Sequence, residues 1–145
     1  TGEKISTHNE EQSQNISPYN FVYFVLNDKR ELLYERINKR VDIMFDKGLV
    51  NEVKNLLNMG YTKDLVSMNG IGYKEVVDYI NGKYSLDETK EIIKRETRHF
   101  AKRQLTWFRR EKDVTMVNYF DYDSIDDTLK YMINTLREKD IIKND

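Results

Sequence analysis

The sequence contains no cysteine. This absence excludes a disulfide framework, a thiolate nucleophile and a cysteine-ligated zinc site. The two histidines, His8 and His99, have no metal-ligating residue at a suitable spacing. The longest apolar run, Phe21 to Leu26, is far too short to cross a bilayer. We therefore expect no membrane segment and no metal site in this sequence.

Proline is almost absent as well, and its one occurrence, Pro18, ends a polar segment without hydrophobic periodicity. We predict that residues 1–18 form a polar linker or loop. The chain of 145 residues is large enough for one domain with a modest core. We expect residues 19–139 to form the helical part of that domain and residues 140–145 to be a frayed tail.

Charge of one sign is not in excess, because 24 Lys and Arg residues stand against 25 Asp and Glu residues. The distribution of charge is more informative, since no Asp or Glu occurs between Thr97 and Arg110. On a helix, spacings of three, four and seven place four cations on one stripe, namely Arg95, Arg98, Lys102 and Arg109. A separate apolar stripe for packing on a core contains Ile93, Phe100, Ala101, Leu105 and Phe108. This pattern indicates a helix that presents cations to phosphate groups.

Two segments have the composition of β-strands. Asn20 to Leu26 is apolar on both faces, which is typical of a parallel strand covered on both sides. Val114 to Phe120 is the other candidate, and two strands alone make a poor sheet. We therefore expect a mainly α fold with one or two β-strands, as part of a larger α/β domain whose other strands this sequence lacks.

Apolar periodicity and capping signals predict a succession of helices. Their expected ranges are 29–47, 49–58, 73–80, 86–110 and 125–139. Asp28 is the expected N-cap of the first helix, and Gly48 its stop. Ser85, with Glu88 three residues later, predicts a capping box at the start of the long fourth helix. Ser124 is the expected cap of the last helix.

Three motifs follow one another in the chain. They are Arg36-Ile37-Asn38-Lys39-Arg40-Val41-Asp42 with Gly48-Leu49, then Ile71-Gly72-Tyr73-Lys74-Glu75, then Thr97-Arg98 with Ala101-Lys102-Arg103-Gln104 and Thr106-Trp107-Phe108-Arg109. Their order and spacing resemble the C-terminal part of the tRNA dimethylallyltransferase family over residues 1 to about 120. Phe100 is a mild departure, because Tyr is more frequent there. The family's P-loop (G-x-x-x-x-G-K-[ST]), its nearby Asp base and its anticodon-stem insertion are absent from this sequence.

The resemblance implies a prenyl transfer to tRNA within a P-loop-type parallel-sheet fold. The exocyclic amine of the adenosine beside the anticodon attacks the first carbon of dimethylallyl diphosphate, and diphosphate leaves. The adenosine must be flipped out of the anticodon loop to be reached. The resemblance also implies Mg²⁺ bound mainly by the missing half, the tRNA anticodon stem-loop as partner, a cytoplasmic location and a monomer when intact.

Arg40 is the expected diphosphate ligand and the one catalytic residue that we assign. On the helix at 29–47 it lies four residues after Arg36 and closer to the apolar stripe, so it is better placed to reach an enclosed ligand. Arg36 is expected to be peripheral. The resemblance points to Arg40 as well. The alternative is an ion pair between Arg40 and a nearby acid such as Asp42 or Glu52.

Two further segments are candidate RNA sites. The loop from Asp64 to Gly72 contains the turn signal Asn69-Gly70 and opens a helix, so it offers backbone N–H groups and close approach. The resemblance places RNA contacts around this loop. In the basic helix, cations can bind phosphates, amide and hydroxyl groups can bind a base edge or sugar, and Trp107 can stack on a base. The predicted RNA-binding residues are Asp64, Ser67, Met68, Asn69, Gly70, Gly72, Tyr73, Thr97, Arg98, Lys102, Arg103, Gln104 and Trp107.

Each segment also has a purely structural alternative. The loop can be an ordinary helix connection, and the basic helix a solvated face over a core to which Trp107 and Phe108 belong. Two other function classes stay open. A free-standing helical nucleic-acid-binding module without catalysis does not explain the apolar strand at 20–26. A protein-interaction segment that uses the acidic C-terminal helix does not explain the motif order.

Overall fold

A computed structural model describes residues 18–111 and 113–143 of the chain. Most of the predicted linker at 1–18 lies outside these residues, as does His8. The elements are β1 (Tyr23–Asn27), α2 (Arg30–Asp46), α3 (Leu49–Asn58), the 3-10 turn η1 (Val66–Asn69), α4 (Tyr73–Ile80), α5 (Leu86–Phe108), β2 (Val114–Asn118), η2 (Tyr119–Asp121) and α6 (Ile125–Glu138). The expectation of a mainly α fold with two strands is confirmed.

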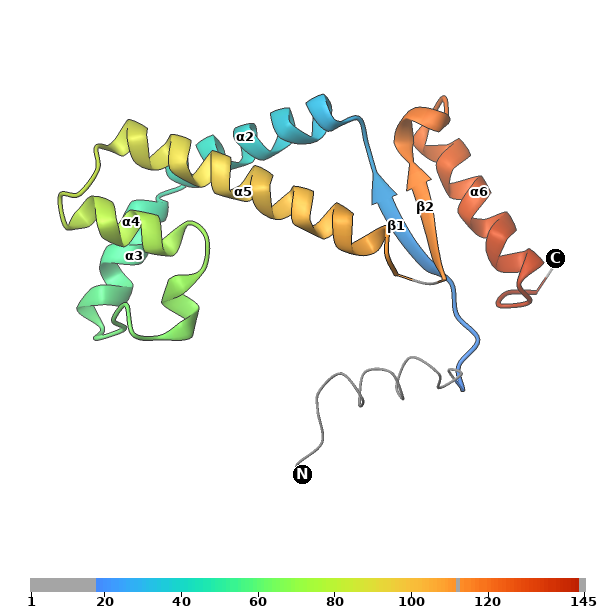
Figure 1. Ribbon diagram of the computed structural model, residues 1–145, viewed down its shortest axis with the longest axis horizontal. Helices are drawn as coiled ribbons and strands as arrows, with labels where there is room; N and C mark the ends of the chain where they lie inside the picture. Colours follow the sequence, from blue (N-terminus) through green and yellow to red (C-terminus); the bar gives the residue numbers. More distant parts are fainter. Residues whose placement is uncertain (1–17, 112, 144–145) are drawn as a thin grey trace.

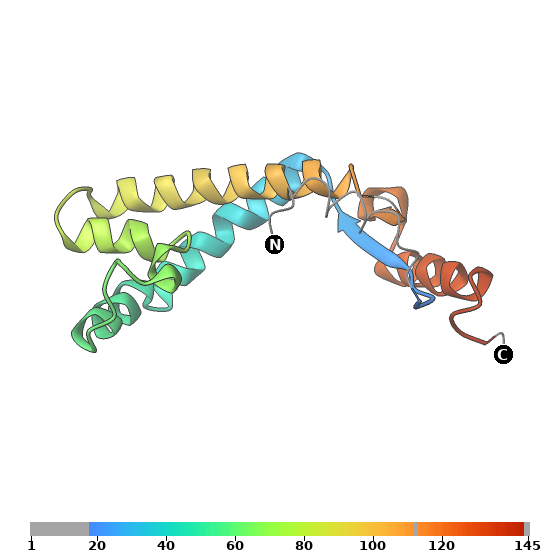
Figure 2. The same ribbon diagram turned by 60° about the horizontal axis from the view of Figure 1, so that its bottom comes forward.

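The described part of the chain is elongated, with helices α2 to α5 at one end and the strands with α6 at the other (Figure 1). Helices α2 and α5 are in contact, and α2 runs obliquely to α5 and diverges from it toward α3 (Figure 2). No helix in the described ranges is long and apolar enough to span a membrane. The long helix α5 connects the helical end to the strands (Figure 1).

The hydrophobic core lies at the helical end. Its buried members come from all four helices there and from η1, namely Val41, Leu49, Val53, Met68, Val76, Val77 and Ile93. Helices α3 and α4 have their predicted bounds. Each begins directly after a glycine whose backbone has a positive φ. Gly48 has φ 96° and Gly72 has φ 105°, a region that side chains with a Cβ rarely adopt. This core positions α2, α4 and α5 relative to one another.

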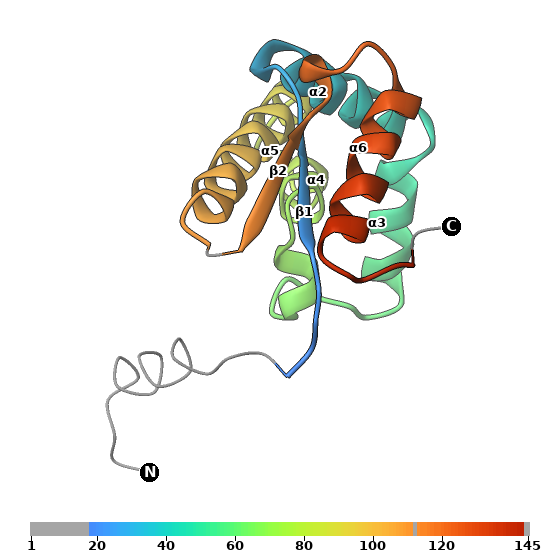
Figure 3. The same ribbon diagram turned by 90° about the vertical axis from the view of Figure 1, so that its right-hand side faces the viewer.

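The two strands form a parallel pair, as predicted, with Tyr23 opposite Val114 and Asn27 opposite Asn118. Figure 3 places the pair between α5 and α6. Val25 and Val117 are buried, but Phe21 and Leu26 are exposed. The expectation of a first strand covered on both faces is therefore wrong for this structure. The physical reason is that β1 has one neighbouring strand among the described residues, so side chains such as Leu26 stay exposed although helices flank the pair.

Two of the three predicted side-chain caps are confirmed. The Ser85 Oγ accepts a hydrogen bond from the Glu88 N–H, and the Glu88 carboxylate accepts one from the Ser85 N–H. Ser124 caps α6 by accepting from the N–H of Asp127. The prediction for Asp28 is wrong, because Lys29 is the N-cap residue of α2 and has no side-chain cap. The Asp28 carboxylate instead accepts a hydrogen bond from the Lys29 N–H and pairs with the Arg36 guanidinium.

The apolar stripe of α5 is only partly buried. Ile93 is 1% exposed and belongs to the core, and Leu105 and Phe108 are half-buried. The ring of Phe108 packs edge-on against Tyr23 of β1 at a centroid distance of 6.0 Å. Phe100 is exposed, so its assignment to the core is wrong. Its ring lies instead under the Arg103 guanidinium, 5.8 Å from it.

Candidate functional site

The C-terminal half of α5 carries an exposed cationic surface, which we call the basic face. It lines an open hollow of about 430 Å³ and consists of His99, Lys102, Arg103, Thr106, Trp107 and Arg110. Trp107 is 53% exposed and contacts Phe108 in a T-shaped arrangement at a centroid distance of 5.0 Å, so about half of its side chain is accessible. The side chains of Lys102 and Arg103 form no ion pair within residues 18–111 and 113–143. These charges are therefore available to an anion.

The cations nearer the start of the same helix differ from those of the basic face. The Lys94 Nζ lies 2.9 Å from the Asp42 carboxylate and 3.1 Å from that of Glu91. The hydrogen bond to Asp42 raises the pKa of Lys94. Arg95 pairs with Glu96 at 3.0 Å and lowers the pKa of that carboxyl. The long basic stripe expected along α5 is thus divided into a neutralised half and an unpaired half.

Thr97 and Arg98 are used within the fold. The Thr97 hydroxyl donates to the Ile93 carbonyl oxygen at 2.7 Å. The Arg98 Nη1 donates to the Asn38 Oδ1 at 2.6 Å and so connects α5 to α2. Both residues are half-buried. A role in RNA binding would have to use the remaining lone pairs of Thr97 and the remaining guanidinium donors of Arg98.

Gln104 lies on a different side of α5 from the basic face. It lines a cavity of about 200 Å³ at the junction of β1, α2 and α5, together with Asp28 and Arg36. The cavity is close to the carboxyl end of β1, where ligands of parallel sheets commonly bind. Gln104 makes no hydrogen bond within the described residues, so its amide is available to a ligand. Asp28 and Arg36 were not assigned to a site from sequence, although Asp28 directly follows a strand, which is a usable signal.

Arg40 is exposed on α2 and lines an open hollow of about 530 Å³ with Arg36, Lys39 and Lys47. The acids proposed as its alternative partners are engaged elsewhere. Asp42 pairs with Lys94, and Glu52 accepts a hydrogen bond from the Tyr73 hydroxyl. Arg40 has no ion pair in the part of the chain that the structure describes. The geometry leaves its guanidinium available.

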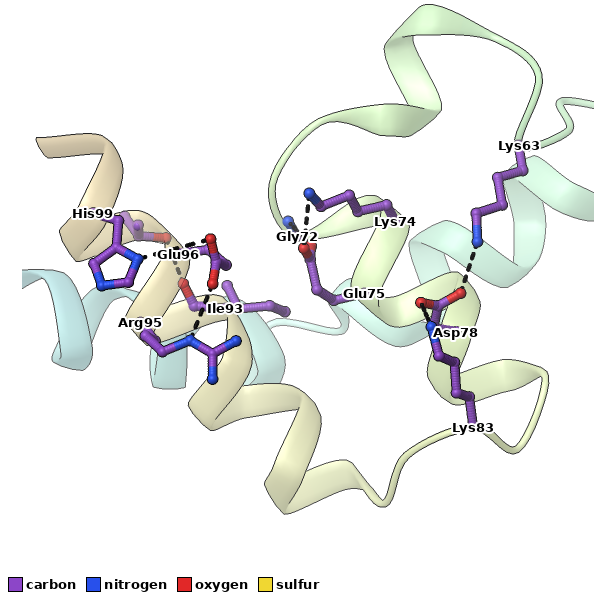
Figure 4. Close-up of polar contacts among 11 residues, drawn as sticks. Lys63, Gly72, Lys74, Glu75, Asp78, Lys83, Ile93, Arg95, Glu96 and His99 are labelled. Carbon is purple, nitrogen blue, oxygen red and sulfur yellow. Dashed lines mark hydrogen bonds and ion pairs between the residues drawn. The ribbon is translucent and has the colours of Figure 1, made fainter. Parts of the chain in front are cut away.

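The loop from Asp64 to Gly72 is held by polar contacts rather than open. The Asn69 side-chain amide donates to the carbonyl oxygens of Lys63 and Leu65 at 3.0 and 3.1 Å. The Asp78 carboxylate binds Lys63 at 2.7 Å and Lys83 at 3.0 Å, which fastens the loop to α4 (Figure 4). Asp64 accepts a hydrogen bond from Thr62 at 3.3 Å. Asn69 therefore shapes the loop with its amide nitrogen.

The other predicted residues of this loop have mixed environments. Ser67 and Gly70 are exposed, whereas Met68 is 2% exposed and belongs to the core, so its side chain cannot reach RNA in this structure. The Gly72 N–H donates to the buried Glu75 carboxylate at 2.7 Å and is not free for a ligand (Figure 4). The Tyr73 hydroxyl donates to Glu52, a hydrogen bond that raises the pKa of Tyr73.

The predicted residues occupy separate surfaces. Helix α4 and the loop before it lie at the start of α5, and the basic face lies near its other end (Figure 1). No group of three or more His, Cys, Asp or Glu in residues 18–111 and 113–143 could hold a metal ion. The described residues therefore offer an exposed cationic surface on the C-terminal half of α5.

A family model for "IPP transferase" matches residues 1–111. The tRNA dimethylallyltransferase of Lachnoclostridium phytofermentans is 57% identical over 99% of this chain and 46% of its own length. That of Acetivibrio thermocellus is 49% identical over 93% of this chain and 44% of its own length. The chain spans about half the length of these relatives.

Two solved structures have the same fold over this region. The tRNA isopentenylpyrophosphate transferase of Bacillus halodurans matches with a TM-score of 0.77 and 39% identity, over 92% of this chain and 45% of that one. The tRNA delta(2)-isopentenylpyrophosphate transferase of Staphylococcus epidermidis matches with a TM-score of 0.78 and 36% identity, over 94% of this chain and 44% of that one.

Proposed function

The chain belongs to the IPP transferase family, and on that premise we propose that it supplies the C-terminal part of a tRNA dimethylallyltransferase. The complete enzyme would move a dimethylallyl group from dimethylallyl diphosphate to the exocyclic amine of the adenosine beside the anticodon. A new C–N bond forms at the first carbon, the C–O bond to diphosphate breaks, and the amine gives up a proton. The substrates are then the tRNA anticodon stem-loop and dimethylallyl diphosphate.

The observation that supports a tRNA partner is the basic face. Two unpaired cations and an exposed tryptophan lie on one side of α5, whereas the cations earlier in the helix are neutralised by acids. Unpaired Lys and Arg bind phosphates, and an exposed ring can stack on an unpaired base. We assign tRNA phosphates to Lys102 and Arg103, and the flipped nucleotide to Gln104.

Arg40 is assigned to the diphosphate. It is exposed and without an acidic partner in the described ranges, beside further cations of α2. A fixed cation stabilises the charge that develops on a leaving diphosphate more than the charge already present on the substrate. The base that accepts the proton from the amine is assigned to the part of the relatives that this chain does not match.

Mg²⁺ is proposed as the metal of the complete enzyme. The described residues do not form a cluster that fits it, so its ligands are assigned to the unmatched part of the relatives as well. The P-loop, a cytoplasmic location and a monomeric complete enzyme are proposed on the same family resemblance. A nucleic-acid-binding module without catalysis is not favoured, because the family match includes β1 and all three motifs.

The test is a chimera in which this chain replaces the matching region of the Lachnoclostridium phytofermentans relative. The chimera is assayed beside the 145-residue chain for prenyl transfer to tRNA with dimethylallyl diphosphate and magnesium. We expect turnover by the chimera and none by the chain alone, because the P-loop and base come from the relative. A folded chimera without activity would contradict the proposed function. Turnover by the chain alone at the chimera's rate would contradict the division of labour.

A further inference from the structure

A buried carboxylate just before α2 holds an exposed arginine of that helix. The Asp28 Oδ2 lies 2.8 Å from the Arg36 Nη1, and the Asp28 side chain is only 7% exposed, whereas that of Arg36 is 64% exposed. The Asp28 Oδ1 also accepts a hydrogen bond from the Lys29 N–H at 2.8 Å. Both carboxylate oxygens are therefore used, and one end of the guanidinium is fixed.

Arg36 is the residue shared by two neighbouring hollows. It lines the cavity that contains Gln104, at the junction of β1, α2 and α5. It also lines the open hollow that contains Arg40, one helical turn further along α2. The side chain thus lies between the residue assigned to the flipped nucleotide and the residue assigned to the diphosphate.

The guanidinium has five N–H donors, and Asp28 is its only ion-pair or hydrogen-bond partner within residues 18–111 and 113–143. The donors that remain face an accessible region, because most of the side chain is exposed. An arginine oriented by a carboxylate loses less freedom when it binds a phosphoryl group, and its planar fork can bind two oxygens at once.

We propose that Arg36, positioned by Asp28, binds a phosphoryl oxygen of a substrate between Gln104 and Arg40. This inference rests on the proposed function and replaces the peripheral role expected for Arg36 from sequence. The phosphoryl group has two sources in the reaction, the diphosphate of the prenyl donor and the phosphate backbone of the tRNA. Asp28 touches no substrate and acts through Arg36.

A structural role is the competing explanation, because a buried carboxylate without a cation is strongly destabilising. The single variant Arg36→Ala cannot separate the two roles, since it leaves the Asp28 charge unpaired. The double variant Asp28→Asn with Arg36→Ala removes both charges together and relieves that penalty. It should melt close to the wild-type chimera while it still lacks the phosphoryl-binding group.

The experiment uses the chimera described above. Thermal melting, kcat and the KM for each substrate are measured for the double variant, for Arg36→Lys and for the control Lys54→Ala, an exposed cation of α3. We expect the double variant to raise the KM for one substrate by roughly 10- to 100-fold, the range of a lost charge-assisted hydrogen bond. A change for dimethylallyl diphosphate identifies the diphosphate, and a change for tRNA identifies its backbone. Lys54→Ala should change neither KM.

Arg36→Lys keeps a charge beside Asp28 but loses the fork, so it should retain the wild-type melting temperature and show the same KM change to a smaller degree. If the double variant does not fold, the KM values of Arg36→Lys decide whether Arg36 binds a phosphoryl group. Both KM values within about twofold of wild type in a folded variant would overturn the inference, a difference well below that of one such hydrogen bond. That result in an active chimera would leave the proposed function intact, whereas an inactive wild-type chimera would remove both.

Discussion

The unpaired charge of the basic face should appear directly in the salt dependence of tRNA binding. We consider the double variant Lys102→Ala with Arg103→Ala in the chimera. Neither side chain has an acidic partner among the described residues, so their removal leaves no unpaired carboxylate behind. Both are exposed on a helix surface, so the fold should be unaffected. The binding change can then be attributed to lost phosphate contacts.

The size of the effect follows from counterion release. Each phosphate contact adds roughly 0.7–0.9 to the slope of log K against log salt, so two contacts add about 1.4–1.8. When salt rises fourfold, from about 50 to 200 mM, the wild-type affinity should therefore fall about 7- to 12-fold more than that of the double variant. The difference is large enough to measure at four or five salt concentrations.

The assay is fluorescence anisotropy with a labelled anticodon stem-loop. The control is Lys130→Ala on α6, because Lys130 is also an exposed cation but pairs with Asp127 at 3.0 Å. A third variant, Gln104→Ala, removes no charge and should keep the wild-type slope while it lowers turnover. A double variant with the wild-type slope and affinity would refute the reasoning and make the basic face an ordinary solvated surface.

Three further results are expected. Arg40→Ala should lower kcat/KM by an amount equivalent to about 2–4 kcal/mol, the usual loss for one preorganised group at a transition state, and wild-type kinetics would remove Arg40 from the site. Lys63 and Lys83 hold the pKa of Asp78 below its usual 3.8, so its stabilising contribution is full above about pH 5 and is lost as the pH falls through the lowered pKa. Melting curves of wild type and Asp78→Asn should therefore differ near neutral pH and converge as the pH falls below the lowered pKa, and a constant difference would contradict the assignment. Ile93→Ala should reduce the free energy of unfolding by about 2–5 kcal/mol in urea titrations, because Ile93 is 1% exposed, and a loss within the error of the measurement would show that this site is not a packed core.

Local signals predicted the helices well. The bounds of α3 and α4 and the capping box of Ser85 and Glu88 are confirmed, because a glycine with positive φ or a side-chain cap acts within one turn of helix. The parallel pairing of the two strands is confirmed as well. The order of the three motifs pointed to the family that the comparisons identify. The helix bounds and caps depend on residues close together in the sequence, and the family resemblance depends on the order of the motifs along it.

The contacts and burial of individual side chains could be identified only from the tertiary structure. The family resemblance placed Met68 in an RNA-contacting loop, and the apolar spacing of α5 placed Phe100 in the core. The structure buries the Met68 side chain and exposes Phe100, because burial depends on how α2, η1, α4 and α5 pack. Spacing alone also gave α5 one continuous basic stripe. The approach of Asp42 from α2 neutralises Lys94, whereas no such acid reaches Lys102 among the described residues.

What the sequence by itself determined about this protein is therefore its helices, its family resemblance and the position of its basic segment. Only the tertiary structure decided which cations are unpaired and which are held by acids. Asp28 and Arg36 show the difference, because they are eight residues apart and their contact requires the turn between β1 and α2 to bury the carboxylate beside the helix. A charge pattern lists the available ions, and packing determines which of them remain free to bind a ligand.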